Sequence, residues 1–300
     1  MKKKSFFRQL FHIFTFVNVY GFYLLTKIVP FSFLPVISKI MGFFASSVIL
    51  KFKKLVFRNL KIAFGDDMDR KEREKIFRRL LYEMFLNFLE ILSLPKIHPD
   101  RIKKMVKVEG ENILKDALKR GKGVVGVCAH LGNFPLMQIF LVKAGYPVNM
   151  IARDTNNIYL ARFGINLRKK LGTPSISKWD LKRAIEESKK WIKNNGILCF
   201  YLDQHAGNGV KVKFFGRDVF APVGAAVFAR KYGSCAVGIF SFRENNGKHR
   251  IVIEGPYQLK KTSNPSKDIV ENTAFFLKRV EYYVRKYPEQ WFSWLHRRFR

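Results

Sequence analysis

The residues best suited to chemistry surround His130. An apolar run over 123–128, Gly-Val-Val-Gly-Val-Cys, predicts a strand, and Ala-His-Leu-Gly-Asn-Phe-Pro-Leu follows over 129–136. Gly132 permits a sharp turn there, and Asn133 is a typical N-cap for the helix that follows. A histidine held at such a turn can take a proton from a hydroxyl, while helix N–H groups face the developing charge. The pattern favours acyl transfer, although Gly132 and Asn133 suit the turn and the cap whatever the function.

Two more polar residues, Arg153 and Asp203, follow predicted strands in the same way. After about residue 105, helical patterns alternate with short apolar runs at Val124–Cys128, Val148–Ala152, Ile197–Leu202, Ala236–Phe240 and Arg250–Glu254. The helical patterns cover 112–119, 135–144, 181–194, 223–231 and 267–287. This alternation predicts an α/β fold with a mostly parallel central sheet flanked by helices. Because sites in such sheets lie at the carboxyl ends of strands, we expect His130, Arg153 and Asp203 to converge on one rim.

The chain is strongly basic and rich in phenylalanine. Its 300 residues include 56 Lys and Arg against 23 Asp and Glu, a formal net charge of +33, together with 30 Phe. Such a charge attracts nucleic acid, anionic lipid headgroups and acidic proteins alike. The phenylalanines and the long uncharged runs favour lipid, and no basic recognition helix of a known pattern supports nucleic-acid binding.

The three cysteines lie inside apolar runs that resemble strands. Cys128, Cys199 and Cys235 have no paired spacing, which argues against a disulfide framework or a zinc site and for a reducing compartment. Cys128 lies two residues before His130, so a Cys–His nucleophile pair is a weaker alternative to a histidine base. A buried free cysteine is the commoner case.

The N-terminal segment predicts contact with a membrane. Residues 1–8 are cationic, residues 9–26 carry no formal charge, and the apolar stretches 28–38 and 40–50 follow. Eighteen helical residues span about 27 Å, close to the hydrocarbon thickness of a bilayer, and the basic flank suits a cytoplasmic N-terminus. The segment either crosses the bilayer or lies in its interface, with a buried core helix as the alternative.

A basic amphipathic helix is predicted directly after this segment. Apolar residues recur at helical spacing from Ile49 to Phe64, and lysines and arginines occupy the other faces. Such a helix after a hydrophobic anchor is typical of a headgroup-binding surface, with a solvated helix face as the alternative. The sequence therefore divides into a membrane anchor of interfacial helices over 1–48 and an α/β domain over 49–300.

Five stretches of the chain together resemble one known family. They are Phe-Arg-Asn-Leu-Lys-Ile-Ala-Phe (57–64), His-Leu-Gly-Asn-Phe (130–134), Ile-Ala-Arg (151–153), Asp-Gln…Gly-Val-Lys-Val-Lys-Phe-Phe-Gly-Arg (203–217) and Pro-Glu-Gln-Trp…Trp-Leu-His-Arg-Arg (288–298). In this order they resemble the bacterial lipid A biosynthesis acyltransferases, the lauroyl and myristoyl transferases of the lysophospholipid acyltransferase superfamily. The set spans nearly the whole chain, so it is far more specific than the short motif at His130.

The resemblance implies an enzyme at the bacterial inner membrane with its site on the cytoplasmic face. It implies that acyl carrier protein donates an acyl chain to a hydroxyl of a glycolipid, a lipid A precursor of the Kdo-lipid A type, without a metal or bound cofactor. The family's general base corresponds to His130. Pro135 replaces the acid that the family places five positions later, and Asp203 is the best substitute to orient His130. Asp203 could instead cap a turn or pair with a basic neighbour.

Two other functions stay open on the sequence alone. The acceptor could be another glycolipid or a lysophospholipid, which changes the substrate but not the chemistry. With Pro135 in place of the acid, the chain could also bind anionic lipid without turnover.

Several polar residues are candidates for binding an anion. Arg153 matches a family arginine and, like Arg217, could hold a phosphate or stabilise an oxyanion. The turn at Gly132 and Asn133 could add donors at the start of its helix. His205 lies in a glycine-rich loop and is a rival base that loop mobility disfavours.

Aromatic residues are candidates for contact with lipid. Phe214 and Phe215 could wall an acyl-chain groove, with plain core packing equally open. The end of the sequence resembles an interfacial belt with an anchor for anionic lipid, formed by Trp291, Trp294, Arg297 and Arg298.

Overall fold

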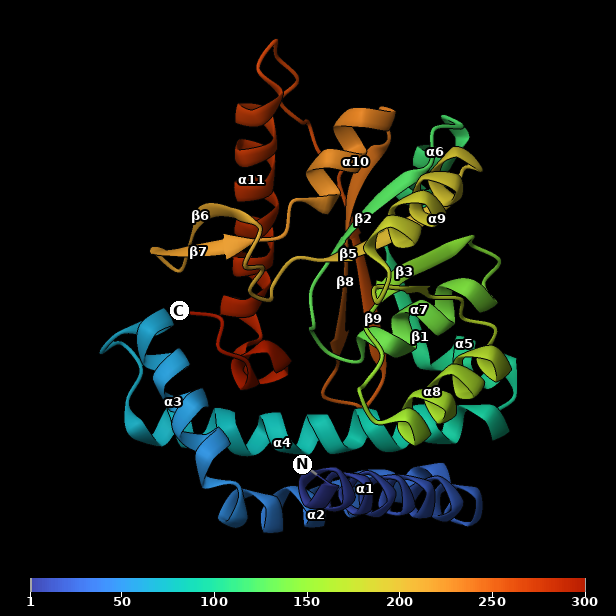
Figure 1. Ribbon diagram of the computed structural model, residues 1–300, viewed down its shortest axis with the longest axis vertical. Coiled ribbons are helices and arrows are strands. Elements are labelled where there is room, and N and C mark those ends of the chain that lie inside the picture. Colours follow the sequence, from blue (N-terminus) through green and yellow to red (C-terminus); the bar gives the residue numbers. More distant parts are fainter. Residues whose placement is uncertain (1, 300) are drawn as a thin grey trace.

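The molecule consists of an α/β body above a layer of N-terminal helices (Figure 1). The computed structural model describes residues 2–299. The first helices are α1 (Lys2–Ile28), α2 (Leu34–Val48), α3 (Leu50–Phe64) and α4 (Arg70–Ser93), with the short 3-10 helix η1 (Phe31–Phe33) after α1. α1 and α2 lie below α4, which in turn lies below the sheet.

Local sequence signals set the ends and the packing of these helices. α4 begins at a capping box in which the side chains of Asp69 and Glu72 accept from each other's backbone N–H. α3 ends at Gly65, whose φ is 62°. α2 lies close to α4 because Gly42 has no side chain, and a Cβ there would come within 3.3 Å of the Tyr82 nitrogen. α4 therefore joins the N-terminal layer to the body.

A seven-stranded sheet forms the centre of the body. Its strands are β1 (Val106–Glu109), β2 (Val124–Cys128), β3 (Val148–Ala152), β4 (Ile176–Ser177), β5 (Ile197–Tyr201), β8 (Cys235–Arg243) and β9 (His249–Glu254). They lie in the order β1-β9-β8-β2-β5-β3-β4, with β8 and β9 antiparallel and the other neighbours parallel. The predicted α/β class with a mostly parallel sheet is confirmed. A separate hairpin contains β6 (Val210–Phe214) and β7 (Arg217–Ala221).

Helices cover both faces of this sheet (Figure 1). They are η2 (Leu94–Lys96), α5 (Pro99–Met105), α6 (Glu111–Lys119), α7 (Phe134–Lys143), α8 (Ile158–Leu171), α9 (Leu181–Lys193), α10 (Gly224–Tyr232), α11 (Pro265–Lys286), η3 (Pro288–Gln290) and η4 (Phe292–Leu295). Alternate residues of a strand point to opposite faces. Val125 and Val127 therefore join the core under α9, α10 and α11, while Val124 and Cys128 join the core under α6, α7 and α8.

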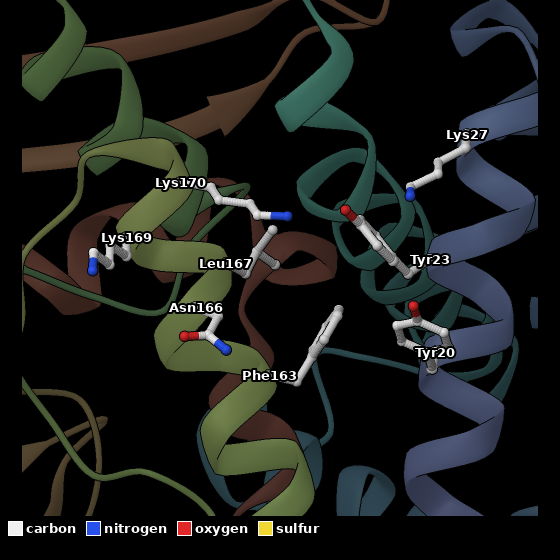
Figure 2. A pocket seen from close by; sticks show the side chains of 8 residues that line it. All are labelled: Tyr20, Tyr23, Lys27, Phe163, Asn166, Leu167, Lys169 and Lys170. Atoms are coloured by element: carbon white, nitrogen blue, oxygen red, sulfur yellow. The ribbon is translucent and has the colours of Figure 1, made fainter.

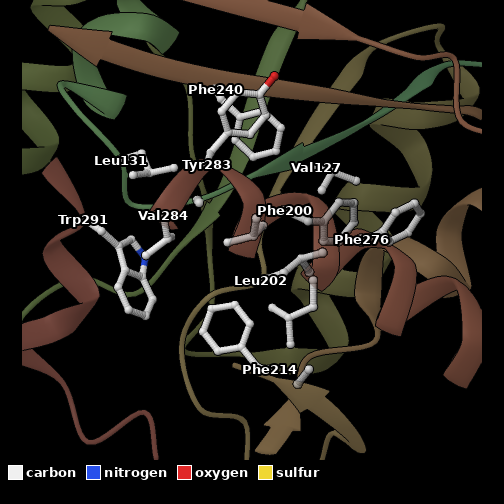
Figure 3. Close-up of a cluster of buried hydrophobic side chains, with 14 of the residues drawn as sticks. Val127, Leu131, Phe200, Leu202, Phe214, Phe240, Phe276, Tyr283, Val284 and Trp291 are labelled. Carbon is white, nitrogen blue, oxygen red and sulfur yellow. The ribbon is translucent and has the colours of Figure 1, made fainter. Parts of the chain in front are cut away.

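The core under α11 also encloses the tail that follows this helix. Figure 3 shows side chains from the sheet, from α11, from the hairpin and from the tail in one cluster, including Val127, Phe200, Phe214, Phe240, Phe276, Tyr283, Val284 and Trp291. The Phe240 and Tyr283 rings have centroids 4.5 Å apart. The tail is therefore part of the interior of the body.

The N-terminal layer leaves many apolar side chains exposed. On α1 and α2 they include Phe7, Leu10, Phe11, Phe14, Val17, Leu24, Ile28, Val36, Ile40, Phe43, Phe44 and Val48. The stretch long and apolar enough to cross a bilayer is Phe31–Val48, of which 17% is buried. The uncharged run 9–26, for which the sequence left a span and an interfacial helix open, lies within α1 and contains the polar residues His12 and Asn18.

Candidate active site

Two neighbouring strand ends bring His130 and Asp203 together. β2 and β5 are parallel, with Cys128 paired to Tyr201, so His130 and Asp203 each lie two residues beyond this pair. Nδ1 of His130 lies 2.8 Å from Oδ1 of Asp203, and the His130 backbone N–H donates to Oδ2 over 3.0 Å. The two side chains that the sequence nominates as base and acid are therefore in contact.

The Asp203 carboxylate is buried among hydrogen-bond donors. Its Oδ2 accepts from the indole N–H of Trp291 and from the Ser293 hydroxyl, each over 2.7 Å. Burial by itself raises the pKa of Asp203. The His130 charge and the hydrogen bonds from His130 and Ser293 outweigh burial, so the pKa lies well below its ordinary value. Asp203 is therefore ionised at neutral pH.

This ionised partner fixes which nitrogen of His130 carries the hydrogen. A carboxylate only accepts hydrogen bonds, so the Nδ1 atom that faces Asp203 must be the donor. In the neutral ring, Nε2 then keeps its lone pair. The His130 side chain is 21% exposed, whereas Asp203 is 0% exposed. The arrangement is that of a reachable base with an acid partner sealed from solvent.

Two aromatic rings hold the His130 ring in place. Phe134 meets it edge-on and Tyr201 lies tilted against it, each with ring centroids 4.8 Å away. The Tyr201 hydroxyl is buried and has no hydrogen-bond partner among the residues that the structure describes. Burial, followed by the nearby thiols and Asp203, raises the pKa of this phenol well above its usual value. Tyr201 is therefore a neutral donor next to the base.

The turn after His130 is fixed through its backbone. Gly132 has a φ of 53°, and a Cβ there would lie 2.5 Å from the Ser241 carbonyl oxygen, so only glycine fits. The Gly132 N–H donates to the Gln290 carbonyl over 3.0 Å, and its carbonyl accepts from Asn87 over 2.8 Å. The turn therefore contacts both α4 and the C-terminal tail.

Asn133 is fully buried, and both ends of its side chain are engaged. Oδ1 caps α7 by accepting from the Leu136 N–H over 3.1 Å, and Nδ2 donates to Glu90 over 2.7 Å. The predicted turn and cap are confirmed. The Gly132 N–H and the Asn133 side chain already have internal partners, so these groups are not free for the predicted binding of an oxyanion or a phosphate.

A buried ionic cluster lies behind this turn, formed by Glu83, Asn87, Glu90, Arg243 and His249, each at most 8% exposed. Arg243 donates to Glu90 through Nη1 over 2.6 Å and Nη2 over 2.7 Å, and to Glu83 through Nε over 2.6 Å. Burial raises the pKa of Glu90, but Arg243 and His249 outweigh it and lower the pKa to about 2. Since Glu90 also accepts from Asn133, the cluster positions the start of α7.

An apolar cavity of about 270 Å³ is bounded by two residues that contact His130, although His130 itself is not among its lining residues. It is lined by Met84, Asn87, Phe88, Ile91, Phe134, Pro135 and Phe292. Phe134 contacts the His130 ring, and the Phe292 N–H donates to the His130 carbonyl over 3.0 Å. Pro135, at the position of the family's acid, lines this cavity, and the carboxylate that contacts Nδ1 of His130 is that of Asp203.

Arg153 lies at the same rim of the sheet as the His130–Asp203 pair. It directly follows β3, which neighbours β5, and adjacent strands are about 4.8 Å apart. Its side chain is exposed, and its guanidinium carbon lies 4.8 Å from the centre of the Trp179 ring. Arg217 is also exposed but begins β7 in the separate hairpin. Of the two candidate arginines, Arg153 therefore shares a sheet edge with the base.

Four aromatic residues predicted to contact lipid are instead part of the core. The Phe214 and Phe215 rings lie 5.7 and 6.5 Å from the Trp291 ring, and Trp294 lies 4.3 Å from Trp291. All four side chains are at most 5% exposed. The predicted acyl groove at Phe214 and Phe215 and the predicted membrane docking of Trp291 and Trp294 are therefore wrong. The hairpin folds over the tail and seals these rings from lipid.

Arg298 is buried as well, which contradicts its predicted role in membrane docking. Its Nη1 donates to the Phe220 carbonyl over 2.8 Å, and its guanidinium carbon lies 5.1 Å from the centre of the Phe214 ring. Burial lowers the pKa of Arg298 to about 10, and the Asp203 charge opposes this shift. The neighbouring Arg297 is exposed.

Cys128 is unsuited to act as a nucleophile beside His130. The three cysteines are free and buried. Burial first, and then the neighbouring Cys199, raise the pKa of the Cys128 thiol well above its usual value. The thiolate that a nucleophile requires is therefore disfavoured.

Sequence reasoning missed several side chains that complete the site. Trp291 and Ser293 bond Asp203, and Tyr201 flanks His130. The resemblance over 288–298 was the available signal for the tail, but tryptophan next to arginine also fits a membrane interface. No local pattern indicated that Arg243 reaches α4.

The fold and the site together define a class of protein. A mostly parallel α/β sheet carries, at its strand ends, a histidine with an ionised carboxylate partner beside an apolar cavity. These are the parts that an α/β acyltransferase requires. The whole chain, residues 1–300, matches the model of the bacterial lipid A biosynthesis acyltransferases, so the protein belongs to this family. The resemblance seen in the sequence is thereby confirmed.

Curated relatives with similar sequences include transferases for two kinds of glycolipid. The lipid A biosynthesis lauroyltransferase of Escherichia coli K12 is 27% identical over 255 residues, which cover 82% of this chain and 78% of the relative. A phosphatidylinositol mannoside acyltransferase of Mycolicibacterium smegmatis is 24% identical over 204 residues, covering 67% of this chain and 65% of the relative. A protein of the same name from Mycobacterium tuberculosis H37Rv is 25% identical over 162 residues, covering 53% and 51%.

Proposed function

We propose that this protein is an O-acyltransferase that moves a fatty acyl chain from acyl carrier protein to a hydroxyl of a lipid A precursor. The observation that carries the proposal is the 2.8 Å contact between His130 and the buried Asp203, beside an apolar cavity. Family membership supports acyl transfer. The relative named for lipid A biosynthesis supports a glycolipid acceptor of the Kdo-lipid A type.

In the proposed reaction His130 is the general base. Its Nε2 takes the proton from the acceptor hydroxyl as that oxygen attacks the thioester carbonyl and forms a C–O bond. The tetrahedral oxyanion then collapses, and the C–S bond breaks. His130 passes the proton to the departing thiolate, so the products are an ester and a free thiol. Asp203 stabilises the imidazolium that exists between the two proton transfers.

Side chains at the same rim of the sheet are proposed to stabilise the negative charge of the oxyanion or of a substrate phosphate. Arg153 is proposed to stabilise the oxyanion or to hold a phosphate of a substrate, because a guanidinium matches such oxygens with two parallel hydrogen bonds. The Tyr201 hydroxyl, without a partner among the described residues, is a second candidate donor. Arg217 is proposed to bind the acceptor headgroup from the hairpin.

The apolar cavity beside His130 is proposed to receive the start of the acyl chain. Phe88, Ile91 and Phe134 give it apolar walls, and a chain placed there would have its carbonyl next to the imidazole. The cavity takes over the role that the sequence suggests for Phe214 and Phe215.

The charge and the apolar surface of the molecule support two parts of the proposal, an acidic protein as the acyl donor and attachment to a membrane. A net charge of +33 favours acyl carrier protein, which is acidic, and anionic membrane surfaces. The exposed apolar face of α1 and α2 supports attachment at the inner membrane, with the body on the cytoplasmic side. Arg297 is proposed to contact lipid phosphates.

A phosphatidylinositol mannoside is the second candidate acceptor. Two mycobacterial relatives carry this substrate in their names at 24 and 25% identity. The general-base chemistry would be the same, so only the acceptor pocket distinguishes the two candidates.

The test is an acylation assay with the detergent-solubilised chain. Acyl carrier protein thioesters and acyl-coenzyme A are compared as donors, with a Kdo-bearing lipid A precursor and a phosphatidylinositol mannoside as acceptors. We expect ester formation from the carrier thioester on the lipid A precursor. His130→Gln should lower kcat about 10²–10⁴-fold, and His205→Ala, which removes the rival base, should leave it within about threefold.

Each contrary result has a defined meaning. Transfer to the mannoside alone would move the proposal to the second acceptor, and equal use of the coenzyme A donor would remove the carrier protein from it. A chain that binds anionic vesicles but forms no ester with any pair would be a lipid-binding homologue, and the proposed enzyme would be wrong.

A further inference from the structure

A cleft between α1 and α8 holds two lysines that face each other. Figure 2 shows Lys27 of α1 and Lys170 of α8 pointing toward each other, with the Tyr23 ring between them. The cleft has a volume of about 520 Å³ and is lined by Tyr20, Tyr23, Lys27, Phe163, Asn166, Leu167, Lys169 and Lys170. It shares no lining residue with the cavity beside His130.

A second cavity continues this cleft. Its volume is about 480 Å³, and it is lined by Tyr23, Thr26, Lys27, Leu92, Pro95, Lys96 and Lys170. The two cavities share Tyr23, Lys27 and Lys170. None of the lining residues is acidic, so the joined cleft gathers Lys27, Lys96, Lys169 and Lys170 without a carboxylate.

Some lysines elsewhere on the surface have acidic partners. Lys53 pairs with Glu74 at 2.6 Å, and Lys260 pairs with Glu271 at 2.6 Å. Among the described residues Lys27, Lys169 and Lys170 form no ion pair; Lys27 instead lies 4.9 Å from the centre of the Tyr23 ring. Like charges that face each other without a carboxylate favour a bound anion.

Lys96 adds to the positive field of the cleft. Its Nζ donates to the Val29 carbonyl, just after α1, over 2.7 Å. Burial first, and then the Arg101 charge, lower the pKa of Lys96.

The rest of the joint between α1 and α8 is well packed. Asn157, the N-cap of α8, donates to the His12 carbonyl over 2.8 Å and to the Thr15 hydroxyl over 2.9 Å. The Phe163 ring lies 6.2 and 5.4 Å from the Tyr20 and Tyr23 rings. The joint is therefore closed by hydrogen bonds and rings at one end and opens at the lysines.

We propose that this cleft binds the phosphate headgroup of an anionic phospholipid, which bridges Lys27 on α1 and Lys170 on α8. The occupant is a lipid because the cleft borders α1, whose outward side chains Leu24 and Ile28 are apolar and exposed. The aromatic rings of Tyr20 and Phe163 offer a surface for the apolar part of the molecule. The bound lipid fastens the membrane-facing helix to the body and takes no part in acyl transfer.

The test compares two double variants of equal charge. Lys27→Ala/Lys170→Ala removes the facing lysines. Lys190→Ala/Lys193→Ala removes two exposed lysines from α9, which packs against the other face of the sheet from α8. Each protein in neutral detergent is titrated with phosphatidylglycerol, with phosphatidylcholine and with glycerol phosphate, and its Tm is followed. Binding to the folded state raises the Tm.

We expect phosphatidylglycerol to raise the Tm of the original chain and of the α9 variant by several degrees. The cleft variant should bind this lipid about thirtyfold more weakly, since each lysine near a headgroup contributes about fivefold. Without lipid, the cleft variant should be no less stable than the original chain, because the removed charges repel.

Three results would overturn the proposal. These are an equal response of the two variants to phosphatidylglycerol, an equal effect of phosphatidylcholine, and a full effect of glycerol phosphate, which would assign the cleft to a free anion. The measurement requires no turnover, so its outcome is independent of the proposed acyltransferase activity.

Discussion

Asp203 and Glu90 are both buried carboxylates bonded to a basic side chain, but the two basic partners differ in their exposure to solvent. Both have a lowered pKa because the partner outweighs the effect of burial. Arg243, the partner of Glu90, is 5% exposed, and all three of its guanidinium nitrogens have internal acceptors. His130, the partner of Asp203, is 21% exposed, and its Nε2 has no internal partner among the described residues.

The difference shows how one kind of interaction serves two purposes. A cation whose donors are all used holds structure and offers nothing to a substrate. A cation-forming ring with one free nitrogen can accept a proton from outside. Asn133 connects the two pairs, because it bonds Glu90 and caps α7, which begins four residues after His130. The buried Arg243–Glu90 pair therefore fixes the position of the turn that follows His130.

The substitution Asp203→Asn tests most directly whether the His130–Asp203 pair differs in function from the Arg243–Glu90 pair. The amide keeps the size of the side chain but loses the charge that fixes the tautomer of His130 and stabilises the imidazolium. We expect kcat to fall about 10³–10⁴-fold, measured in the acylation assay. Asp218→Asn is the control, since Asp218 is exposed and pairs only with lysines of the hairpin. Near-normal turnover would mean that the pair is structural, like the one at Glu90.

Arg243→Met tests the buried Arg243–Glu90 pair. It leaves Glu83 and Glu90 buried without their cation, so the free energy of unfolding should fall by about 3–5 kcal/mol, measured by urea titration. Arg183→Met is the control, because Arg183 forms an exposed pair with Glu187 and should leave stability unchanged. Adding Glu90→Gln to the Arg243 variant should recover part of the loss. Equal effects of Arg243→Met and Arg183→Met would contradict a structural role for the cluster.

The smallest expected effect is on the pH dependence of stability. The pKa of Glu90 is lowered from 4.5 to about 2 in the folded state, so the unfolded state binds its proton first as the pH falls. Its contribution is complete above about pH 4.5 and is lost as the pH falls toward 2. Between pH 4.5 and 2.5, Glu90→Gln should reduce the slope of unfolding free energy against pH by up to about 1.4 kcal/mol per unit. An unchanged slope would show that the pKa of Glu90 is not lowered in the folded state.

Much of the body could be predicted because its signals are local. Val124–Cys128 and Val148–Ala152 have the predicted strand bounds, and five of the helices in the body coincide with the predicted helical stretches. α8 was not predicted, because arginines, lysines and Asn166 interrupt its apolar pattern. The contact between His130 and Asp203 followed from one rule about strand ends, so it needed no knowledge of side-chain packing.

What could not be predicted depends on contacts between distant segments. Trp291 and Trp294 have the composition of a membrane interface, and the hairpin and α3, which pack against them from distant parts of the chain, make them interior. Arg243 lies beyond the end of the strand predicted at Ala236–Phe240, and its partners on α4 lie more than 150 residues away in sequence. Such pairs leave no periodic signal in a single sequence.

The hydrogen bonds from Trp291 and Ser293 to Asp203 can form only after the C-terminal part of the chain has been synthesised. Trp291 and Ser293 follow Asp203 by 88 and 90 residues. At about 5–20 residues per second, a ribosome adds them roughly 4–18 s after the aspartate. Until then the nascent chain already contains the imidazole and its acid, but not the indole and hydroxyl that anchor the acid. The proposed acyl transfer would therefore require translation to pass residue 293.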